Sequence, residues 1–194
     1  MSGDVPLGAT PLDGDDMEGL LLPHVATRKD LDFWEFRNII MAEEWAFAVR
    51  AEDVLREEFV CELHRRMYGD VWAWAGDFRR RQTNIGVPPA QIREQLRMLL
   101  DDTSFWIEQQ TWPTDELLAR FHHRMVWIHP FRNGNGRHAR LMADVIARRI
   151  CGVPSFTWGS ANLSDQGEDR VRYIRALKDA DGGDYAALLA FVRS

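Results

Sequence analysis

The sequence has few cysteines, no long apolar run and no zinc-binding pattern, and each absence narrows what the chain can be. Its two cysteines, Cys61 and Cys151, form no CxxC pair, and this usage fits a reduced, cytoplasmic compartment. No run of about eighteen apolar residues occurs, so we expect no membrane span. A basic segment followed by an apolar one is also missing at the start, so we expect no secretory signal. HExxH and Cys/His spacings typical of zinc sites are absent.

The chain contains fewer basic residues than acidic residues. The chain has 24 lysines and arginines against 30 aspartates and glutamates, which gives a net charge of −6 and a pI of about 5.5. This balance argues against a general nucleic-acid-binding surface. It leaves open a specific protein target and a homodimer. A length of 194 residues is enough for one domain with a substantial core.

Helical spacing of apolar residues is abundant. It predicts helices over about 30–50, 53–68, 90–109, 163–179 and 184–192. A further helix should run from Leu117 to Ile128, because positions 117, 118, 121, 125 and 128 are apolar, and Pro130 should end it. The tryptophans and phenylalanines of the first helix favour core packing over a ligand-binding box.

The stretch from His129 to Arg140 carries the chemistry. Gly134 and Gly136 allow the backbone to approach a ligand closely, and the start of the following helix offers unpaired N–H groups at the positive end of its dipole. Arg137 and Arg140 are three residues apart and therefore share a helix face. His129 titrates near neutral pH and could accept a proton from a hydroxyl. The alternative is an Asn-Gly turn with solvated arginines, but one short stretch holding all these residues favours a phosphate site.

The pattern His129-Pro130-Phe131-x-x-Gly134-Asn135-Gly136-Arg137-x-x-Arg140 resembles HPFx(D/E)GNGRxxR, the signature of the Fic (Fic/Doc) family. Residues 74–79 (Trp-Ala-Gly-Asp-Phe-Arg) resemble the segment before the family's substrate flap, and residues 173–177 and 183–185 resemble its C-terminal helices. Residues 8–13 (Gly-Ala-Thr-Pro-Leu-Asp) resemble a bacterial subfamily labelled mobile mystery protein B. The resemblance covers about residues 30–194.

The resemblance implies an all-α, Fic-like helical bundle with a short β-hairpin flap. It also implies transfer of AMP from ATP to a hydroxyl of a target protein. Carried over by residue, His129 would be the general base, Gly134, Asn135 and Gly136 the anion hole, Arg137 a phosphate contact and Arg140 the γ-phosphate ligand. Tyr173 would line the adenine pocket, although a core or surface role fits it nearly as well.

The segment between Phe78 and Pro89 shows no helical face, and Gly86 and Pro88 interrupt it. It therefore predicts an extended loop or small hairpin. In the resemblance this is the flap, with Thr83, Asn84, Ile85 and Gly86, which would pair with the target's backbone as an added strand. For Arg79–Arg81 the sequence favours a solvated charge run, with an acidic target contact as the alternative.

Asn133 is the one departure from the signature. The family normally has Asp or Glu there to hold Mg²⁺, whereas Asn offers a neutral carbonyl oxygen, so we expect it to be a weak ligand for Mg²⁺ or Mn²⁺. The departure raises a non-catalytic alternative: a nucleotide-binding regulator controlled by a partner. His129 argues against it, because binding alone needs no base. A third alternative keeps the fold but moves another phosphate-containing group or removes AMP.

The first 26 residues are expected to form a separate N-terminal segment, before a catalytic domain over 27–194. Glu18-Gly19 matches the end of the family's inhibitory pattern (S/T)xxxE(G/N), but Gly14 stands at the Ser/Thr position. A Glu18 carboxylate on Arg140 would occupy the fork that the γ-phosphate needs. A solvated acidic tail is the equal alternative.

Overall fold

The computed structural model describes residues 19–22, 27–160 and 167–194, and all regular elements of this part are helices. Eight are α-helices. They are α2 (Arg28–Ala46), α3 (Ala51–Val54), α4 (Glu57–Tyr68), α5 (Ile92–Gln109), α6 (Thr114–Ile128), α7 (Asn135–Ile146), α8 (Glu168–Asp181) and α9 (Ala186–Val192). A π-helical turn, η2 (Ala147–Cys151), extends α7, and two short 3₁₀ turns are η1 (Pro89–Gln91) and η3 (Trp158–Ser160). None of the described helices combines the length and the apolar content that crossing a bilayer requires.

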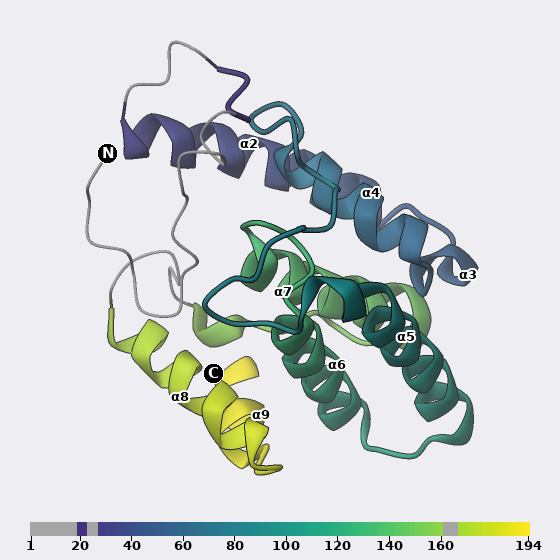
Figure 1. Ribbon diagram of the computed structural model, residues 1–194. Coiled ribbons are helices and arrows are strands. Elements are labelled where there is room, and N and C mark those ends of the chain that lie inside the picture. Colours follow the sequence, from purple (N-terminus) through teal and green to yellow (C-terminus); the bar gives the residue numbers. More distant parts are fainter. Residues whose placement is uncertain (1–18, 23–26, 161–166) are drawn as a thin grey trace.

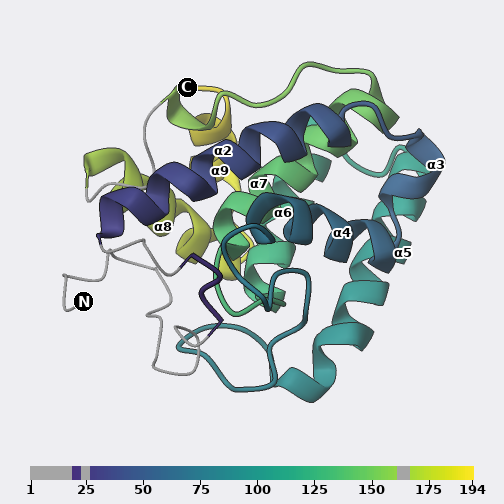
Figure 2. The same ribbon diagram turned by 90° about the horizontal axis from the view of Figure 1, so that it is seen from above.

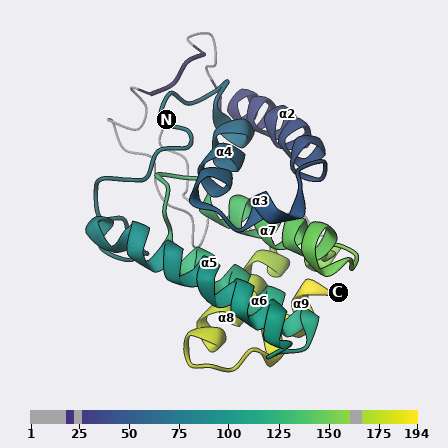
Figure 3. The same ribbon diagram turned by 90° about the vertical axis from the view of Figure 1, so that its right-hand side faces the viewer.

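Helix α7 lies at the centre of the molecule (Figure 1). The pair α2 and α4 packs on one side of it, and α8 and α9 lie on the other, while α6 packs directly along it. Figure 2 shows α8 and α5 on opposite sides of the molecule, and Figure 3 shows α5 and α6 running side by side. The loop between α6 and α7 is therefore surrounded by elements from both ends of the chain.

The core forms where apolar faces of these helices meet α7. Phe121, Met125 and Ile128 on α6 and Met142 and Val145 on α7 are almost completely buried. Burying side chains of this size is the main favourable contribution to folding. Not all aromatic side chains of α2 pack into this core, because Phe33 and Phe36 are more than half exposed.

The all-α prediction is confirmed, but the predicted β-hairpin flap is wrong for the described residues. Residues 79–88 form bends and irregular coil, and an isolated antiparallel bridge between Phe78 and Phe131 lies directly before the segment. The sequence showed that this stretch was not helical. It did not show that its backbone groups bind side chains and neighbouring loops instead of each other.

Several predicted helix boundaries also differ. The first helix ends at Ala46 and not near residue 50, and the second is divided because Leu55 and Arg56 leave helical geometry between α3 and α4. At the other end, α6 stops at Ile128 as expected, with His129 in a left-handed conformation as its C-cap. This boundary fixes the position of the residue that the sequence selected as the base.

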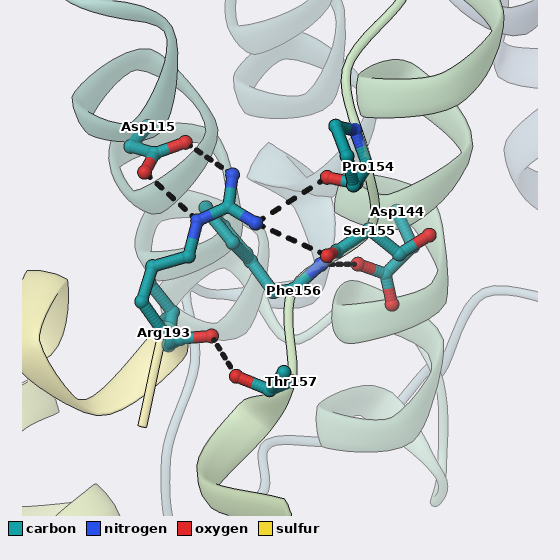
Figure 4. A network of polar contacts seen from close by, with 8 residues as sticks. Asp115, Asp144, Pro154, Ser155, Phe156, Thr157 and Arg193 are labelled. Atoms are coloured by element: carbon teal, nitrogen blue, oxygen red, sulfur yellow. Dashed lines mark hydrogen bonds and ion pairs between the residues drawn. The ribbon is translucent and has the colours of Figure 1, made fainter.

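Side chains near the C-terminus lock α9 to the start of α6 and to the segment before η3 (Figure 4). The Arg193 guanidinium binds the Asp115 carboxylate and donates to the carbonyl oxygen of Ser155 at 3.1 Å. Asp144 on α7 accepts hydrogen bonds from the backbone N–H of Phe156 at 2.9 Å and from the indole of Trp158 at 2.8 Å. These contacts attach Trp158 to α7.

A capping box starts α2, so we predict that Thr27→Ala will lower the free energy of unfolding by about 1 kcal/mol. The Thr27 hydroxyl accepts from the backbone N–H of Asp30 at 3.1 Å, and the Asp30 carboxylate accepts from the Thr27 N–H at 3.2 Å. Urea unfolding measures the change. Thr111→Ala, also at an exposed position, is the matched control and should change stability by less than about 0.5 kcal/mol; an equal loss in both variants would contradict the role of the cap.

Candidate nucleotide-binding and transfer site

His129 is held at the junction of α6 and the loop. Its side chain is 5% exposed, and its backbone has φ 53° and ψ 60°, which is unusual for a residue with a Cβ. The imidazole Nδ1 lies 3.3 Å from the carbonyl oxygen of Val126. Since a carbonyl oxygen only accepts, Nδ1 carries the proton and Nε2 is the basic nitrogen. Burial lowers the pKa of His129 to about 4, so the ring is neutral at physiological pH.

The loop after His129 is shaped by the Asn135 side chain. Its Oδ1 accepts from the backbone N–H of Phe131 at 2.9 Å, and its Nδ2 donates to the carbonyl oxygen of Phe131 at 2.8 Å. The side chain is 2% exposed, so it supports the loop from inside. Asn135 would therefore contribute to an anion hole through its backbone N–H, at the first turn of α7.

The two glycines of the loop have different reasons to be glycine. Gly134 has φ 76°, and a Cβ there would lie 2.5 Å from the ring of Tyr68, so the fold itself requires glycine. A Cβ on Gly136 would meet no atom within 4 Å. Glycine at 136 therefore leaves open space at the N-terminus of α7, where an anionic group would be attracted.

Arg137 and Arg140 point from α7 toward different neighbours. Arg137 donates from Nη1 to Glu35 on α2 at 2.7 Å, and the second oxygen of this buried carboxylate accepts from the Trp72 indole at 2.8 Å. Burial acts to lower the pKa of Arg137, but Tyr68 and Glu35 outweigh it and raise the pKa above its ordinary value. The guanidinium is therefore permanently charged and held in place from α2.

Arg140 points toward α8, and its guanidinium carbon lies 5.7 Å from the centre of the Tyr173 ring on that helix. The Tyr173 hydroxyl is 2.8 Å from His122 Nε2, and the His122 ring packs against Trp158 with centroids 4.6 Å apart. Tyr173 is 5% exposed. The structure thus brings Tyr173 to Arg140, and the contact between His122 and Trp158 connects both to Asp144.

Sequence reasoning missed Arg170, a third arginine near this corner. It lies three residues before Tyr173 and so shares a face of α8 with it. Burial lowers its pKa, and so do the positive charges of Arg140 and Arg137. Three like charges that influence one another are a suitable environment for a polyphosphate. The i,i+3 spacing to Tyr173 was the one signal available in the sequence.

Asn133 is placed poorly for metal binding. Its Oδ1 accepts from the N–H of Gly134 at 2.7 Å, and its backbone oxygen is 3.0 Å from His64 Nε2. In the described part of the chain, no group of three or more His, Cys, Asp or Glu side chains could hold a metal ion. Among the described residues, the side chains alone therefore provide no such cluster for Mg²⁺ or Mn²⁺.

His64 has a larger role than the sequence indicated. It is completely buried, and its ring stacks on Phe131 with centroids 3.7 Å apart. Its Nδ1 accepts from the N–H of Gly76 at 3.0 Å, so Nε2 carries the proton that is donated to Asn133. One neutral histidine therefore joins the segment before the flap to the signature loop. Neither the position nor the spacing of His64 indicated this contact, which spans 69 residues.

The flap residues lie where a target could reach them. Asn84 and Ile85 are exposed, and Thr83 and Gly86 are partly buried. The Thr83 hydroxyl donates to the Ile85 carbonyl oxygen at 2.5 Å, so side-chain contacts hold the bend. These residues offer an exposed segment but no preformed strand.

The prediction of a solvated Arg79–Arg81 run is wrong for Arg79, which is 3% exposed and bonded to carbonyl oxygens. Arg80 and Arg81 are exposed, as predicted. Three consecutive arginines gave no sign that the first points inward. The predicted inhibitory Glu18 and the subfamily-like residues 8–13 lie outside the described residues. Gly19, next to Glu18, accepts from the backbone N–H of Ala73 at 2.8 Å.

Comparisons with known proteins identify relatives of this chain. Residues 54–147 match the model of the Fic/DOC family. The chain is 29% identical over 153 residues to the protein adenylyltransferase Fic of Aedes aegypti and 30% identical over 149 residues to that of Nematostella vectensis. These alignments cover 76% and 74% of this chain but 29% and 32% of the relatives, so the chain spans less than a third of the length of either.

Solved structures show the same fold. Fic-1 of C. elegans (residues 134–508) superposes with a TM-score of 0.68 at 26% identity, over 91% of this chain and 51% of that one. The Bartonella tribocorum protein BepC, solved with bound AMPPNP, has a TM-score of 0.66 at 14% identity and covers 93% and 97% of the two chains. At that identity the similarity establishes the fold alone.

The buried histidines should make the fold sensitive to acid. Burial lowers the pKa of His122 to about 3 and the pKa values of His129 and His138 to about 4. The unfolded chain protonates these rings near pH 6.5, so it binds more protons than the folded chain as the pH falls below that value. The stability that they contribute is complete above about pH 6.5 and is lost toward pH 4. Burial raises the pKa of Asp144 to about 6, which acts in the opposite direction.

We predict a loss of about 3 kcal/mol in unfolding free energy between pH 7.5 and pH 5.5. The three histidines each remove roughly 1.3 kcal/mol over this interval, and protonation of Asp144 in the folded state returns about 0.8 kcal/mol. Urea titrations at the two pH values, followed by circular dichroism, measure the change. Equal stability at both values, or higher stability at pH 5.5, would contradict the buried neutral state of these rings.

Proposed function

Because residues 54–147 place this chain in the Fic/DOC family, we propose that it is a protein adenylyltransferase. It moves AMP from ATP to a Ser, Thr or Tyr hydroxyl of a target protein in the cytoplasm. The observation that carries the proposal is the neutral, buried His129 beside an α7 N-terminus that is open at Gly136 and followed by Arg137 and Arg140. A base, an anion-binding helix end and two guanidinium groups are what such a transfer needs.

In the proposed reaction, His129 Nε2 takes the proton of the target hydroxyl. The hydroxyl oxygen forms a bond to the α-phosphorus, and the bond between the α-phosphorus and the bridging oxygen breaks to release pyrophosphate. The N–H groups at the start of α7 stabilise the negative charge that develops on the phosphate oxygens. Arg137 and Arg140 bind and orient the leaving pyrophosphate. Tyr173, beside Arg140, would border the nucleotide.

The target would be bound by the flap at Thr83, Asn84, Ile85 and Gly86. Two of these residues are exposed, and the backbone of the bend is not paired with an opposing strand in the described part of the chain. A target segment could therefore supply the strand partner that the chain itself lacks. This mode of binding aligns a hydroxyl without requiring one fixed target sequence.

The proposal divides the chain into an N-terminal segment, 1–26, and a catalytic domain, 27–194. Within the first, Glu18 would inhibit the enzyme by binding Arg140 and excluding the γ-phosphate. The pairing of residues 19–21 with residues 71–73 holds the residue after Glu18 next to Trp72, whose indole binds the carboxylate that holds Arg137, the other arginine of the motif.

A binding-only regulator is the second candidate, and Asn133 is the observation that favours it. Its Oδ1 is used by the N–H of Gly134, and a neutral amide is a poor Mg²⁺ ligand. The divalent ion would then be held through the nucleotide phosphates with little help from the protein. The BepC structure with AMPPNP supports nucleotide binding by this fold and is compatible with both candidates.

We predict that Glu18→Gly will increase AMP transfer and that adding His129→Ala will abolish it. Intact-mass spectrometry after incubation with ATP and Mg²⁺ or Mn²⁺ measures the adenylyl adduct on the chain itself. Equal adduct in the wild type and in Glu18→Gly would remove the inhibitory role of Glu18 while keeping the enzyme. Binding of ATP, measured by calorimetry, without adduct in any variant would favour the binding-only regulator.

Asn133→Asp should raise the affinity for Mg²⁺ in the presence of ATP by about tenfold, because a carboxylate replaces a neutral amide oxygen. The measurement is the Mg²⁺ concentration that gives half-maximal ATP binding or transfer. Arg132→Lys, which keeps the charge at the neighbouring position, is the matched control. An unchanged Mg²⁺ dependence in Asn133→Asp would show that position 133 is not a ligand.

A further inference from the structure

Arg79 is a buried arginine whose partners in the described part of the chain are backbone carbonyl oxygens. Its Nε donates to the oxygen of His129 at 2.7 Å, and its Nη1 donates to the oxygen of Arg81 at 2.9 Å. Its Nη2 donates to the oxygen of Val87 and lies 3.4 Å from that of Ile128. The side chain is 3% exposed, and burial lowers its pKa. One guanidinium therefore binds four carbonyl groups with its planar fork of donors.

These carbonyl groups belong to two segments far apart in the sequence. Arg81 and Val87 belong to the flap region, whereas Ile128 and His129 end α6. Backbone contacts accompany the guanidinium, because the Arg79 N–H donates to Pro130 at 2.9 Å and the Val87 N–H donates to Ile128 at 3.4 Å. The guanidinium thus connects the proposed target-binding segment to the backbone of the proposed base.

Gly86 fits against the same junction from the flap. Its φ is +105°, and a Cβ there would lie 2.6 Å from Arg79 Nη2 and 2.6 Å from the Cβ of His129. Both distances are shorter than van der Waals contact. Glycine is therefore required for the flap to approach the guanidinium and the histidine at the same time.

His129 needs such support because of its backbone conformation. A left-handed conformation is unfavourable for a residue with a Cβ and persists only where the surroundings enforce it. The bond from Arg79 Nε to the His129 carbonyl oxygen, together with the bond from the His129 N–H to Met125, supports this conformation at both peptide groups. The conformation in turn sets where the imidazole lies.

We infer that Arg79 is a positioning residue that couples the flap to the base. By holding Val87 and His129 with one guanidinium, it fixes the distance between a target seated on the flap and the imidazole that accepts the target's proton. The inference rests on the proposed transfer reaction. It predicts that disturbing the junction from either side, at Arg79 or at Gly86, causes the same defect.

The experiment compares the full chain with Arg79→Lys, Gly86→Ala and the double variant, in the wild-type or Glu18→Gly background, whichever forms more adduct. Lysine keeps the positive charge but cannot bind several carbonyl groups in one plane. We expect each single variant to slow adduct formation at least tenfold and to leave the dissociation constant for ATP with Mg²⁺ within twofold. The double variant should be no slower than the slower single variant, because both act on one junction.

Two matched controls separate this effect from general damage. Arg97→Lys makes the same exchange at an exposed arginine of α5, outside the flap. Gly183→Ala introduces a Cβ at another glycine with positive φ, 90°, where no atom lies within 4 Å. Both controls should retain transfer within twofold of the parent chain. Multiplication of the two single effects in the double variant, or loss of ATP binding together with transfer, would overturn the inference.

A second measurement does not depend on transfer. NMR titration of the His129 ring should show its pKa rising by one unit or more in Arg79→Lys and in Gly86→Ala, because a loosened junction lets water reach the imidazole, and remaining unchanged in the two controls. If no background transfers AMP, the proposed function fails and this titration alone decides the inference. An unchanged ring pKa in both test variants would overturn it. If Arg79→Lys does not fold, Gly86→Ala, which keeps the guanidinium, provides the decision.

Discussion

The two hydrogen bonds between the Asn135 amide and the backbone of Phe131 are the contact on which the site depends. The chain must pass from α6 to α7 across residues 129–134, and both helix ends would otherwise leave polar backbone groups without partners. The amide satisfies one donor and one acceptor of Phe131 at once. With this turn fixed, His129 and the first N–H groups of α7 are held on the same loop.

The interior of this helical core includes buried polar side chains. His64, His122 and His138 are completely buried, as is most of the Asn135 amide. Groups of this kind are costly to bury without partners and, once satisfied, allow few alternative arrangements. His64 shows how one arrangement is selected, because its two ring nitrogens need a donor from Gly76 and an acceptor from Asn133. The neutral state of the ring is therefore part of the loop's geometry.

The sequence predicted the features that depend on local spacing. The all-α class, the end of α6 at Ile128 and the helix after the glycines follow from apolar periodicity and from Pro130, and the structure confirms them. The proximity of His129 to Arg137 and Arg140 follows from their positions in one short stretch. The roles assigned to these residues remain predictions, and so does the inhibitory role of Glu18.

Other features depend on contacts between distant segments, and spacing carries no information about them. Glu35 reaches Arg137 across 102 positions, and Arg79 reaches His129 across 50. In the sequence both look like ordinary charges on a solvated face. The predicted hairpin is wrong for a related reason, because the polar groups around Gly86 are bound by Arg79 and Gln82 and not by an opposing strand.

The family segment depends on a helix that lies outside it. The matched region begins at residue 54, whereas Glu35 belongs to α2. Recombination that carried only residues 54–147 into another protein would strip Arg137 of its carboxylate and the Trp72 indole of its acceptor, and it would uncover the face of α4 on which α2 packs. The stretch of chain needed to build this site is therefore longer than the segment that matches the family model. Substitutions in α2 and α7 must consequently be compatible with each other for the lineage to keep the site.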